Sequence, residues 1–155
     1  MKGNESVIER LNARLSDELA ATNQYVLHAE ICENWGYGKL HGTIMKRAVV
    51  EMKHAEKLIE RILFLEGRPI VSKLGQIRIG SKVEDMHQND RDSEVQAIKD
   101  YNADIEHARS VGDGGTRELL EANLKDEENH LDWIEAQIDQ IGHMGIGTYL
   151  SQQRD

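Results

Sequence analysis

Four acid-x-x-His pairs in the sequence have a spacing that suits metal binding. They are Glu51 with His54, Glu84 with His87, Asp104 with His107, and Glu127 with His130. An acid and a histidine three residues apart lie on one face of an α-helix, so both side chains can reach one ion. Because the spacing occurs four times, it does not by itself identify a site. The position of each pair along its helix is therefore needed to decide which pairs could form a metal site.

Length and composition limit the fold that can carry such a site. The chain has 155 residues, of which 39% are hydrophobic, and this suits one domain over residues 1–155. A single proline, 5% aromatic residues and 30% charged residues are typical of helices rather than of a β-sandwich or barrel. We therefore expect an all-α fold.

Net charge and the chain start exclude some partners. The formal net charge of -9 and the absence of a basic stripe argue against nucleic acid. The acidic charge fits either a solvated exterior or an acidic cavity that concentrates cations. No apolar segment follows Met1, no stretch is long enough to span a membrane, and Cys32 is the only cysteine. We expect a reduced, cytoplasmic location and no membrane partner.

Hydrophobic periodicity predicts four long helices. Stop and start signals bound them at about 4–35, 39–66, 81–111 and 116–142, with a short apolar tail, 144–150, that predicts a fifth helix. The third helix is expected to start with a capping box of Ser81 and Glu84, and the fourth with Thr116 as its cap, ending at Gly142. The connection 67–81 is too long for adjacent antiparallel helices, and we interpret it as a crossover along a four-helix bundle.

Each predicted helix carries one glutamate in its apolar seam, which is the row of core-facing positions three or four residues apart. These residues are Glu18, Glu51, Glu94 and Glu127. Each falls roughly two to three residues before the middle of its helix, or about 3–5 Å at 1.5 Å per residue, so all four should lie at one level. Glu84 and His87 lie on the order of 15–20 Å from that level, and Asp104 and His107 miss it by roughly 10–15 Å.

Four buried carboxylates need compensating positive charge. Arg47 and Arg61 lie on the seam of the second helix, but a turn or more away from Glu51. Four carboxylates and two imidazoles without cations would repel one another and lose hydration, and two divalent ions remove that cost. A set rich in carboxylates favours iron or manganese over structural zinc.

The chain resembles the bacterioferritins, which are haem-containing, ferritin-like di-iron proteins, over essentially all 155 residues. The resemblance rests on segments 1–3, 23–25, 51–55, 59–67 and 126–130. It implies a homo-oligomeric shell of 24 subunits that oxidises Fe(II) with dioxygen or hydrogen peroxide and stores Fe(III) mineral. The implied ferroxidase ligands for two iron ions per subunit are Glu18, Glu51, His54, Glu94, Glu127 and His130, with Glu51 and Glu127 bridging. A small [2Fe-2S] ferredoxin is the implied electron donor.

Met52 cannot face the same ions as Glu51 and His54, because it is turned about 100° and 200° away from them on the helix. With Met45, Val49 and Ile59 it forms an apolar stripe on the outside of the bundle, which could be an ordinary dimer contact. The resemblance implies instead that Met52 is an axial ligand of haem b shared between two subunits. Two thioether ligands suit electron transfer rather than oxygen binding, since both axial positions are filled.

Some positions differ from relatives that hold a further iron on the inner surface. Such relatives have His and Asp where this chain has Lys46 and Val50, so we expect no iron there. The resemblance also implies aromatic residues near the centre that could deliver an electron to an oxygen intermediate, at the positions of Tyr25, Trp35 and Trp133. These three side chains could instead serve only in packing. Four further residues could bind metal by their side-chain type, but we expect that they do not. They are His28, His41, His143 and Cys32.

Two other functions use the same pattern. A di-iron peroxidase or oxidoreductase of the rubrerythrin type would share the two Glu-x-x-His pairs, but such proteins usually carry a cysteine-rich domain for which this chain lacks cysteines. A non-haem ferritin or a purely structural shell would leave Met52 or His130 unexplained. Iron storage with ferroxidase activity is the prediction.

Overall fold

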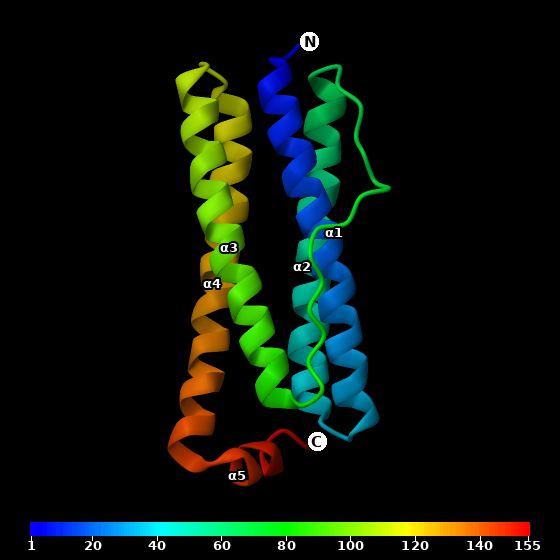
Figure 1. The fold of residues 1–155 in the computed structure, drawn as a ribbon, viewed down its shortest axis with the longest axis vertical. Helices are drawn as coiled ribbons and strands as arrows, with labels where there is room; N and C mark the ends of the chain where they lie inside the picture. The colour runs from blue at the N-terminus through cyan, green and yellow to red at the C-terminus, as the bar shows by residue number, and fades with distance from the viewer.

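A computed structural model describes residues 1–155 as an all-α protein without β-strands (Figure 1). The helices are α1 (Glu5–Asn34), α2 (Gly38–Phe64), α3 (Val83–Ser110), α4 (Gly114–Met144) and α5 (Ile146–Ser151). The expected bundle of four long helices with a short fifth helix is confirmed. None of the helices is both long enough and apolar enough to cross a membrane.

The four long helices form two antiparallel pairs, α1 with α2 and α3 with α4 (Figure 1). Helix α1 also packs on α3, and α2 packs on α4. The segment between α2 and α3 returns along the length of the bundle, so that α2 and α3 run in the same direction. This is the predicted crossover.

Polar contacts with α1 hold the crossover in place. The Gly75 amide donates to the Ser16 carbonyl at 2.9 Å. The Arg78 amide donates to Oε1 of Gln24 at 3.0 Å, and the Gly80 amide to Nε2 of His28 at 3.0 Å. These bonds satisfy backbone donors that a loop would otherwise leave to water.

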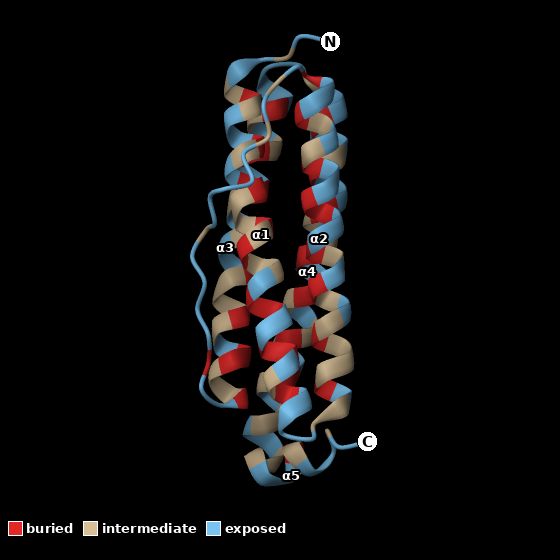
Figure 2. Ribbon diagram, turned by 90° about the vertical axis from the view of Figure 1, so that its right-hand side faces the viewer, coloured by how far each residue is buried: buried red, intermediate tan, exposed pale blue.

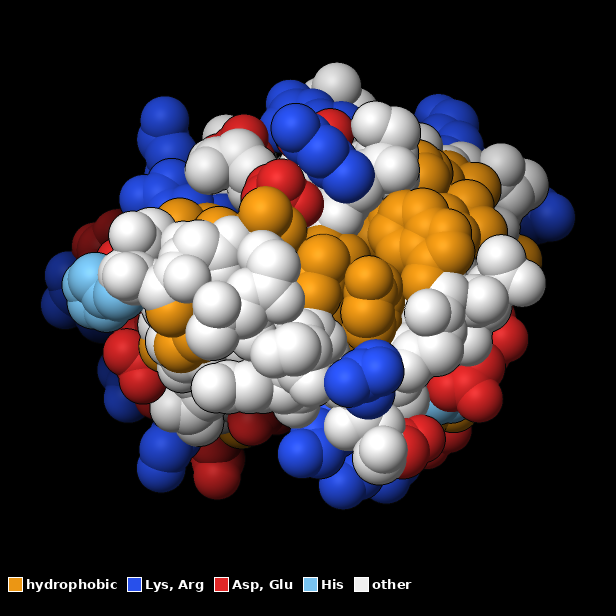
Figure 3. Space-filling view, turned by 90° about the horizontal axis from the view of Figure 1, so that it is seen from below, with side chains coloured by type: hydrophobic (Ala, Val, Ile, Leu, Met, Phe, Trp, Pro, Cys, Tyr) orange, Lys and Arg blue, Asp and Glu red, His pale blue; other side chains and the backbone are white.

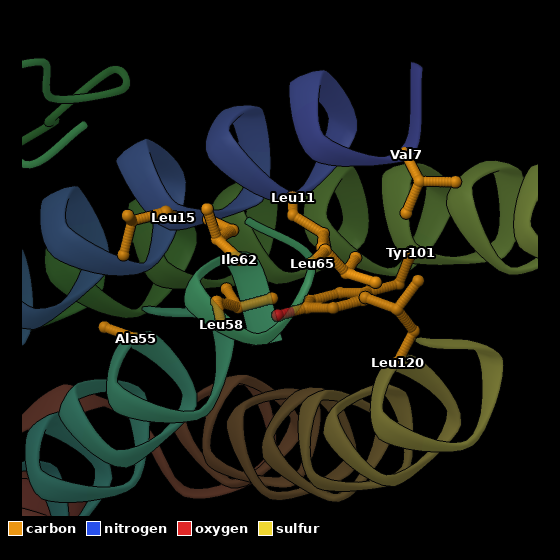
Figure 4. Packing of buried hydrophobic residues seen from close by; sticks show 9 residues of the cluster. All are labelled: Val7, Leu11, Leu15, Ala55, Leu58, Ile62, Leu65, Tyr101 and Leu120. Atoms are coloured by element: carbon orange, nitrogen blue, oxygen red, sulfur yellow. The ribbon is translucent and has the colours of Figure 1, made fainter. Parts of the chain in front are cut away.

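Two hydrophobic clusters make up the core, one toward each end of the bundle. The first contains Val7, Leu11, Leu15, Ala55, Leu58, Ile62, Leu65, Tyr101 and Leu120 (Figure 4). The second contains Tyr25, Ala29, Cys32, Leu40, Ile44, Ala48, Val83, Met86 and Tyr149. Buried positions recur along each helix on the side facing its neighbours (Figure 2). Burying such side chains contributes about 1.5–3 kcal/mol each for the larger ones, and the clusters keep water from the polar residues between them.

The start of α3 differs from its prediction. Lys82 is the N-cap and makes no side-chain cap bond, so the capping box of Ser81 and Glu84 is wrong. The Ser81 hydroxyl donates to the carboxylate of Asp85 at 3.2 Å instead. The chain is held just before the helix by the bond from Gly80 to His28, which leaves Ser81 outside the cap position. Glu84 and Asp85 still place negative charge in the first turn, where the helix dipole favours it.

Helix α4 begins earlier and ends later than predicted. Asp113, not Thr116, is its N-cap, and Oδ1 of Asp113 accepts from the Thr116 amide at 3.0 Å. Arg61 of α2 donates to Oγ1 of Thr116 at 3.0 Å and to Oδ1 of Asp113 at 2.8 Å, which ties the two helices together. The helix continues through Gly142 and ends at Gly145, whose φ of 80° is left-handed.

The end of the bundle that carries α5 exposes hydrophobic side chains near its centre, with charged side chains around the edge (Figure 3). Trp35, the C-cap residue of α1, belongs to this end and is 43% exposed. It follows Tyr25 by ten residues, which corresponds to roughly 15 Å along a helix. Trp35 is therefore remote from the level of the four glutamates, contrary to the expectation from the resemblance.

Candidate metal centre

The structure brings the six residues with the implied ligand pattern to one place in the middle of the bundle. They come from all four long helices and are Glu18, Glu51, His54, Glu94, Glu127 and His130. Each is buried, with side chains at most 5% exposed. They share a level because each glutamate interrupts the apolar seam of its helix near mid-length, as the periodicity predicts.

One group of possible ligands is formed by Glu18, Glu51, His54 and Glu127. Their candidate ligand atoms all lie within 4.8 Å of one another. Nδ1 of His54 lies 2.9 Å from Oε1 of Glu127 and 3.4 Å from both Oε1 of Glu18 and Oε2 of Glu51. A carboxylate-rich pocket with one imidazole suits a divalent ion such as Fe(II) or Mn(II).

A second group is formed by Glu51, Glu94, Glu127 and His130. Nδ1 of His130 lies 2.9 Å from Oε1 of Glu51, 3.3 Å from Oε1 of Glu94 and 3.8 Å from Oε2 of Glu127. Both groups contain Glu51 and Glu127, so these two carboxylates are placed to bridge two ions. Glu18 and Glu94 are each confined to one group.

Several buried atoms of these residues lack a hydrogen bond of acceptable geometry. They are Oε2 of Glu18, Oε1 of Glu51, Nδ1 of His54, Oε2 of Glu94 and Oε1 of Glu127. A buried polar atom without a partner costs on the order of 1–3 kcal/mol. Concentration of so many at one point fits a site whose remaining partners are metal ions. The donor set, four carboxylates and two imidazoles, has the chemistry that iron requires.

Proton binding is favoured at several of these residues. Burial raises the pKa of Glu51, Glu94 and Glu127 well above the usual range, and the neighbouring carboxylates raise it further. Burial lowers the pKa of His54, but the nearby carboxylates of Glu127 and Glu18 outweigh burial, and the net shift is upward. Protons therefore compete with a metal ion for these groups.

Two buried tyrosines hold the terminal carboxylates. The Tyr25 hydroxyl of α1 donates to Oε1 of Glu94 on α3, and the Tyr101 hydroxyl of α3 donates to Oε1 of Glu18 on α1 at 2.5 Å. Burial raises the pKa of both phenols far above the usual value, so each remains a protonated donor. The sequence pattern pointed to Tyr25 and gave no sign of a role for Tyr101.

A carboxylate outside the six orients one imidazole. Oδ2 of Asp126 lies 2.8 Å from Nε2 of His54, whose Nδ1 faces the centre. Such a partner fixes the orientation of a metal-binding imidazole. Sequence reasoning assigned Asp126 no role, although its position next to Glu127 was the available signal.

The other acid-x-x-His pairs are engaged elsewhere. Nε2 of His87 lies 3.0 Å from the Tyr149 hydroxyl, and burial lowers the pKa of His87 to about 4. Asp104 accepts ion pairs from Arg10 at 2.9 Å and Arg14 at 3.0 Å. His107 contacts Ser6, and Glu84 belongs to the first turn of α3. Neither pair belongs to the two candidate metal groups.

The remaining residues named from the sequence lie outside the two groups of possible ligands. The rings of Trp133 and His87 pack in a T-shaped arrangement, with their centroids 5.8 Å apart. Lys46 is exposed, whereas Val50 lines a cavity of about 520 Å³ on α2 and α4 that also borders His54 and Asp126. Among the other histidines, His28 contacts Asp90 and His41 contacts the Ala29 carbonyl. The non-ligand candidates His143 and Cys32 are likewise outside both metal groups.

Met52 points away from the centre, as its position on the helix predicts. It is 51% exposed on α2, and Val49 is 40% exposed on the same helix. Met45 and Ile59 of the predicted apolar stripe are half-buried. A free thioether on an apolar surface has the chemistry that an axial haem ligand requires, so the residues present fit that cofactor.

Comparison with known proteins identifies the family. A family profile described as a ferritin-like domain matches residues 8–144, which places the bundle among ferritin-like proteins. A bacterioferritin of Streptomyces coelicolor is 42% identical over 97% of this chain and 90% of the relative. Bacterioferritins of Rhodobacter capsulatus and Brucella melitensis are 40% and 39% identical, over 94% and 96% of this chain and 92% of each relative. The chain belongs to the bacterioferritin family.

Proposed function

We propose that this protein stores iron and detoxifies Fe(II) in the cytoplasm. It oxidises Fe(II) to Fe(III) at the centre formed by Glu18, Glu51, His54, Glu94, Glu127 and His130. The oxidised iron is stored as mineral inside a shell of 24 identical subunits. The observation that carries the proposal is the meeting of six buried ligands, several with unpartnered atoms, between two hydrophobic clusters.

Iron is the substrate of this reaction and dioxygen or hydrogen peroxide the oxidant. Two Fe(II), hydrogen peroxide and two protons give two Fe(III) and two water molecules, and with dioxygen the product is hydrogen peroxide. Glu51 and Glu127 lie where they can contact both iron ions, which holds the two electron donors close to one oxidant. Burial raises the pKa of Glu51 and Glu127, so protons compete with Fe(II) for these two carboxylates.

The protein residues also control orientation and water. Asp126 holds His54, while Tyr25 and Tyr101 hold Glu94 and Glu18. A cavity of about 170 Å³ between α1, α3 and the crossover borders Glu18, Glu51, Glu94 and Glu127. It gives the reactants a path to the centre. A second cavity, of about 520 Å³, borders His54 from the side of α2 and α4.

Haem b is the proposed resident cofactor, held by Met52 of two subunits across a homodimer contact. When bound, it supplies one-electron transfer between the outside and the stored iron. The electron donor is proposed to be a small [2Fe-2S] ferredoxin. The exposed thioether and the neighbouring apolar surface of α2 support this assignment.

Initial rates of Fe(II) oxidation test the proposed site. Glu127→Ala and His130→Ala each remove one ligand, and we expect both to abolish fast oxidation while the shell still assembles. Glu128→Ala is the matched control, because Glu128 is exposed between the two ligands. Normal rates in both ligand variants would contradict the proposed site. A rubrerythrin-type peroxidase would consume peroxide at this site without building a mineral core, so iron content after loading separates the two functions.

A further inference from the structure

The residue types that form the metal centre occur twice in the chain, at a constant difference in residue number. Adding 76 to a residue number in the α1–α2 half gives the corresponding residue in the α3–α4 half. The matched pairs are Glu18 and Glu94, Tyr25 and Tyr101, Glu51 and Glu127, and His54 and His130. The contacts repeat as well, since each tyrosine donates to the terminal glutamate of the other half. The two candidate metal positions are therefore close to equivalent in their ligands.

The equivalence ends behind the ligands. Position 126 carries the aspartate that contacts His54, whereas its counterpart, position 50, carries valine. Position 47 carries arginine, whereas its counterpart, position 123, carries asparagine. Nδ2 of Asn123 donates to the Tyr101 hydroxyl at 3.3 Å. Arg47 lines a small cavity of about 10 Å³ together with Tyr25 and Trp133. One metal position thus has a neutral amide behind its tyrosine, and the other has a cation.

The guanidinium of Arg47 has no counter-ion of its own. It forms no ion pair, and its Nη1 atom is shielded from solvent without a hydrogen bond. Burial lowers the pKa of Arg47, and the negative charge of Glu94 is the largest influence in the opposite direction. Asp90 borders the same cavity, but its Oδ1 accepts bonds from His28 and Gln24. Arg47 therefore lies behind Tyr25, which borders the same cavity and donates to Glu94.

The Glu18 side also has an arginine nearby, but that arginine is neutralised. Arg14 lies four residues before Glu18 and is buried in ion pairs. Its partners are Asp17 at 3.3 Å, Asp100 at 2.9 Å and Asp104 at 3.0 Å. Three carboxylates more than balance one guanidinium. The two sides of the centre thus differ in electrostatic potential although their ligands match.

We propose that Arg47 makes the two metal positions unequal, so that a divalent cation binds more tightly at Glu18 and His54 than at Glu94 and His130. A fixed positive charge behind Tyr25 repels a cation that arrives at the Glu94 position. The first Fe(II) enters the position of Glu18 and His54, and the second position controls when an iron pair is complete. The inference rests on the proposed function, because it assumes that the six residues hold two ions.

Calorimetric titration of the assembled protein with Co(II) tests this without any oxidation step. We expect two classes of binding at the centre whose affinities differ by about tenfold or more, a difference that one nearby charge can produce. In Arg47→Gln the weaker affinity should rise toward the stronger one. Arg47→Lys keeps the charge and should keep the difference. The matched control is Lys46→Gln, which removes an exposed charge one position away and should change neither affinity.

Two ligand variants assign the affinities to positions. His130→Ala should lose the weaker Co(II) and retain the stronger, and His54→Ala should do the reverse. Equal affinities in the wild-type protein, or a weaker affinity that does not rise in Arg47→Gln, would overturn the role of Arg47 and leave the metal centre standing. Failure of the wild-type protein to bind Co(II) at the centre would overturn the proposed function and this inference together.

Discussion

Nε2 of His54 lies 2.8 Å from Oδ2 of Asp126, on the side of the imidazole opposite to the metal centre. The contact joins α2 to α4 and leaves Nδ1 of His54 directed toward Glu18, Glu51 and Glu127. The side chain of Asp126 is about half exposed, so it can hold the imidazole from the surface of the bundle. The orientation of this proposed ligand is thus set by a residue outside the six.

Removal of this carboxylate should weaken metal binding without changing the ligands. We expect Asp126→Ala to lower the affinity for Co(II) at the Glu18 and His54 position by roughly 10–100-fold, because the imidazole is no longer held. Calorimetric titration measures the affinity. Glu128→Ala, an exposed neighbour on the same helix, is the control and should bind as the wild type does. An unchanged affinity in Asp126→Ala would show that His54 is oriented by other contacts.

Metal binding should release protons and should weaken as the pH falls. Glu51, Glu94 and Glu127 have pKa values raised by burial and by neighbouring carboxylates, so these groups bind protons more tightly than free carboxylates do. An incoming divalent ion has to displace these protons. Titration with Co(II) in weak buffer containing a pH indicator would measure the number released. Binding that is independent of pH, with no proton release, would contradict the protonated state.

The cap of α4 gives a prediction about stability. Burial raises the pKa of Asp113, but hydrogen bonds from Thr116 and the charge of Arg61 outweigh it, so the folded-state pKa lies below the usual value. Asp113→Ala should cost about 1–2 kcal/mol of unfolding free energy near neutral pH, since it removes the cap and a partner of Arg61. A depressed pKa stabilises the fold above the unfolded pKa of about 4 and loses that effect below it.

Denaturant unfolding between pH 7 and pH 3 would measure the difference between Asp113→Ala and the wild type. We expect the difference to shrink as the pH falls through the folded-state pKa. Asp139→Ala removes an exposed acid from the same helix and serves as the control. A cost that grows toward low pH would contradict the sign of the shift.

Met52 gives a prediction about the proposed haem. Met52→Leu keeps the side-chain volume and removes the sulfur ligand, so the assembled protein should lose haem absorbance and still oxidise Fe(II). Met45→Leu changes another methionine of the same stripe and should retain the haem. The absorption spectrum after purification with added haem is the measurement. An unchanged haem spectrum in Met52→Leu would exclude Met52 as the ligand.

Periodicity was sufficient to predict the bundle and the common level of the four glutamates. Glu18 and Glu94 are recognisable because each fills a seam position that would otherwise be apolar, and burial then follows from the seam. The acid-x-x-His pair of Glu84 and His87 can be excluded as a metal site, because it lies in the first turns of α3. Local patterns carry this information because a helix converts residue spacing directly into position.

Contacts between distant segments were not predictable in the same way. Asp113 and Thr116 are both good caps, and only Arg61 from α2, together with the geometry of the turn, distinguishes their roles. Tyr101 looks like an ordinary seam residue until its hydroxyl is placed on Glu18. The position of Trp35 at the helix end was available from counting residues, but its implied role came from the resemblance alone.

Anomalous diffraction from crystals soaked in Fe(II) under limited oxidant would locate the iron in the assembled protein. We expect two iron peaks, both between Glu51 and Glu127, one beside His54 and the other beside His130. We expect no well-occupied peak beside Lys46 and Val50, because an ammonium group and an alkyl side chain offer iron no ligand. The absence of iron between Glu51 and Glu127, or a third well-occupied peak at residues 46 and 50, would contradict the proposed di-iron centre.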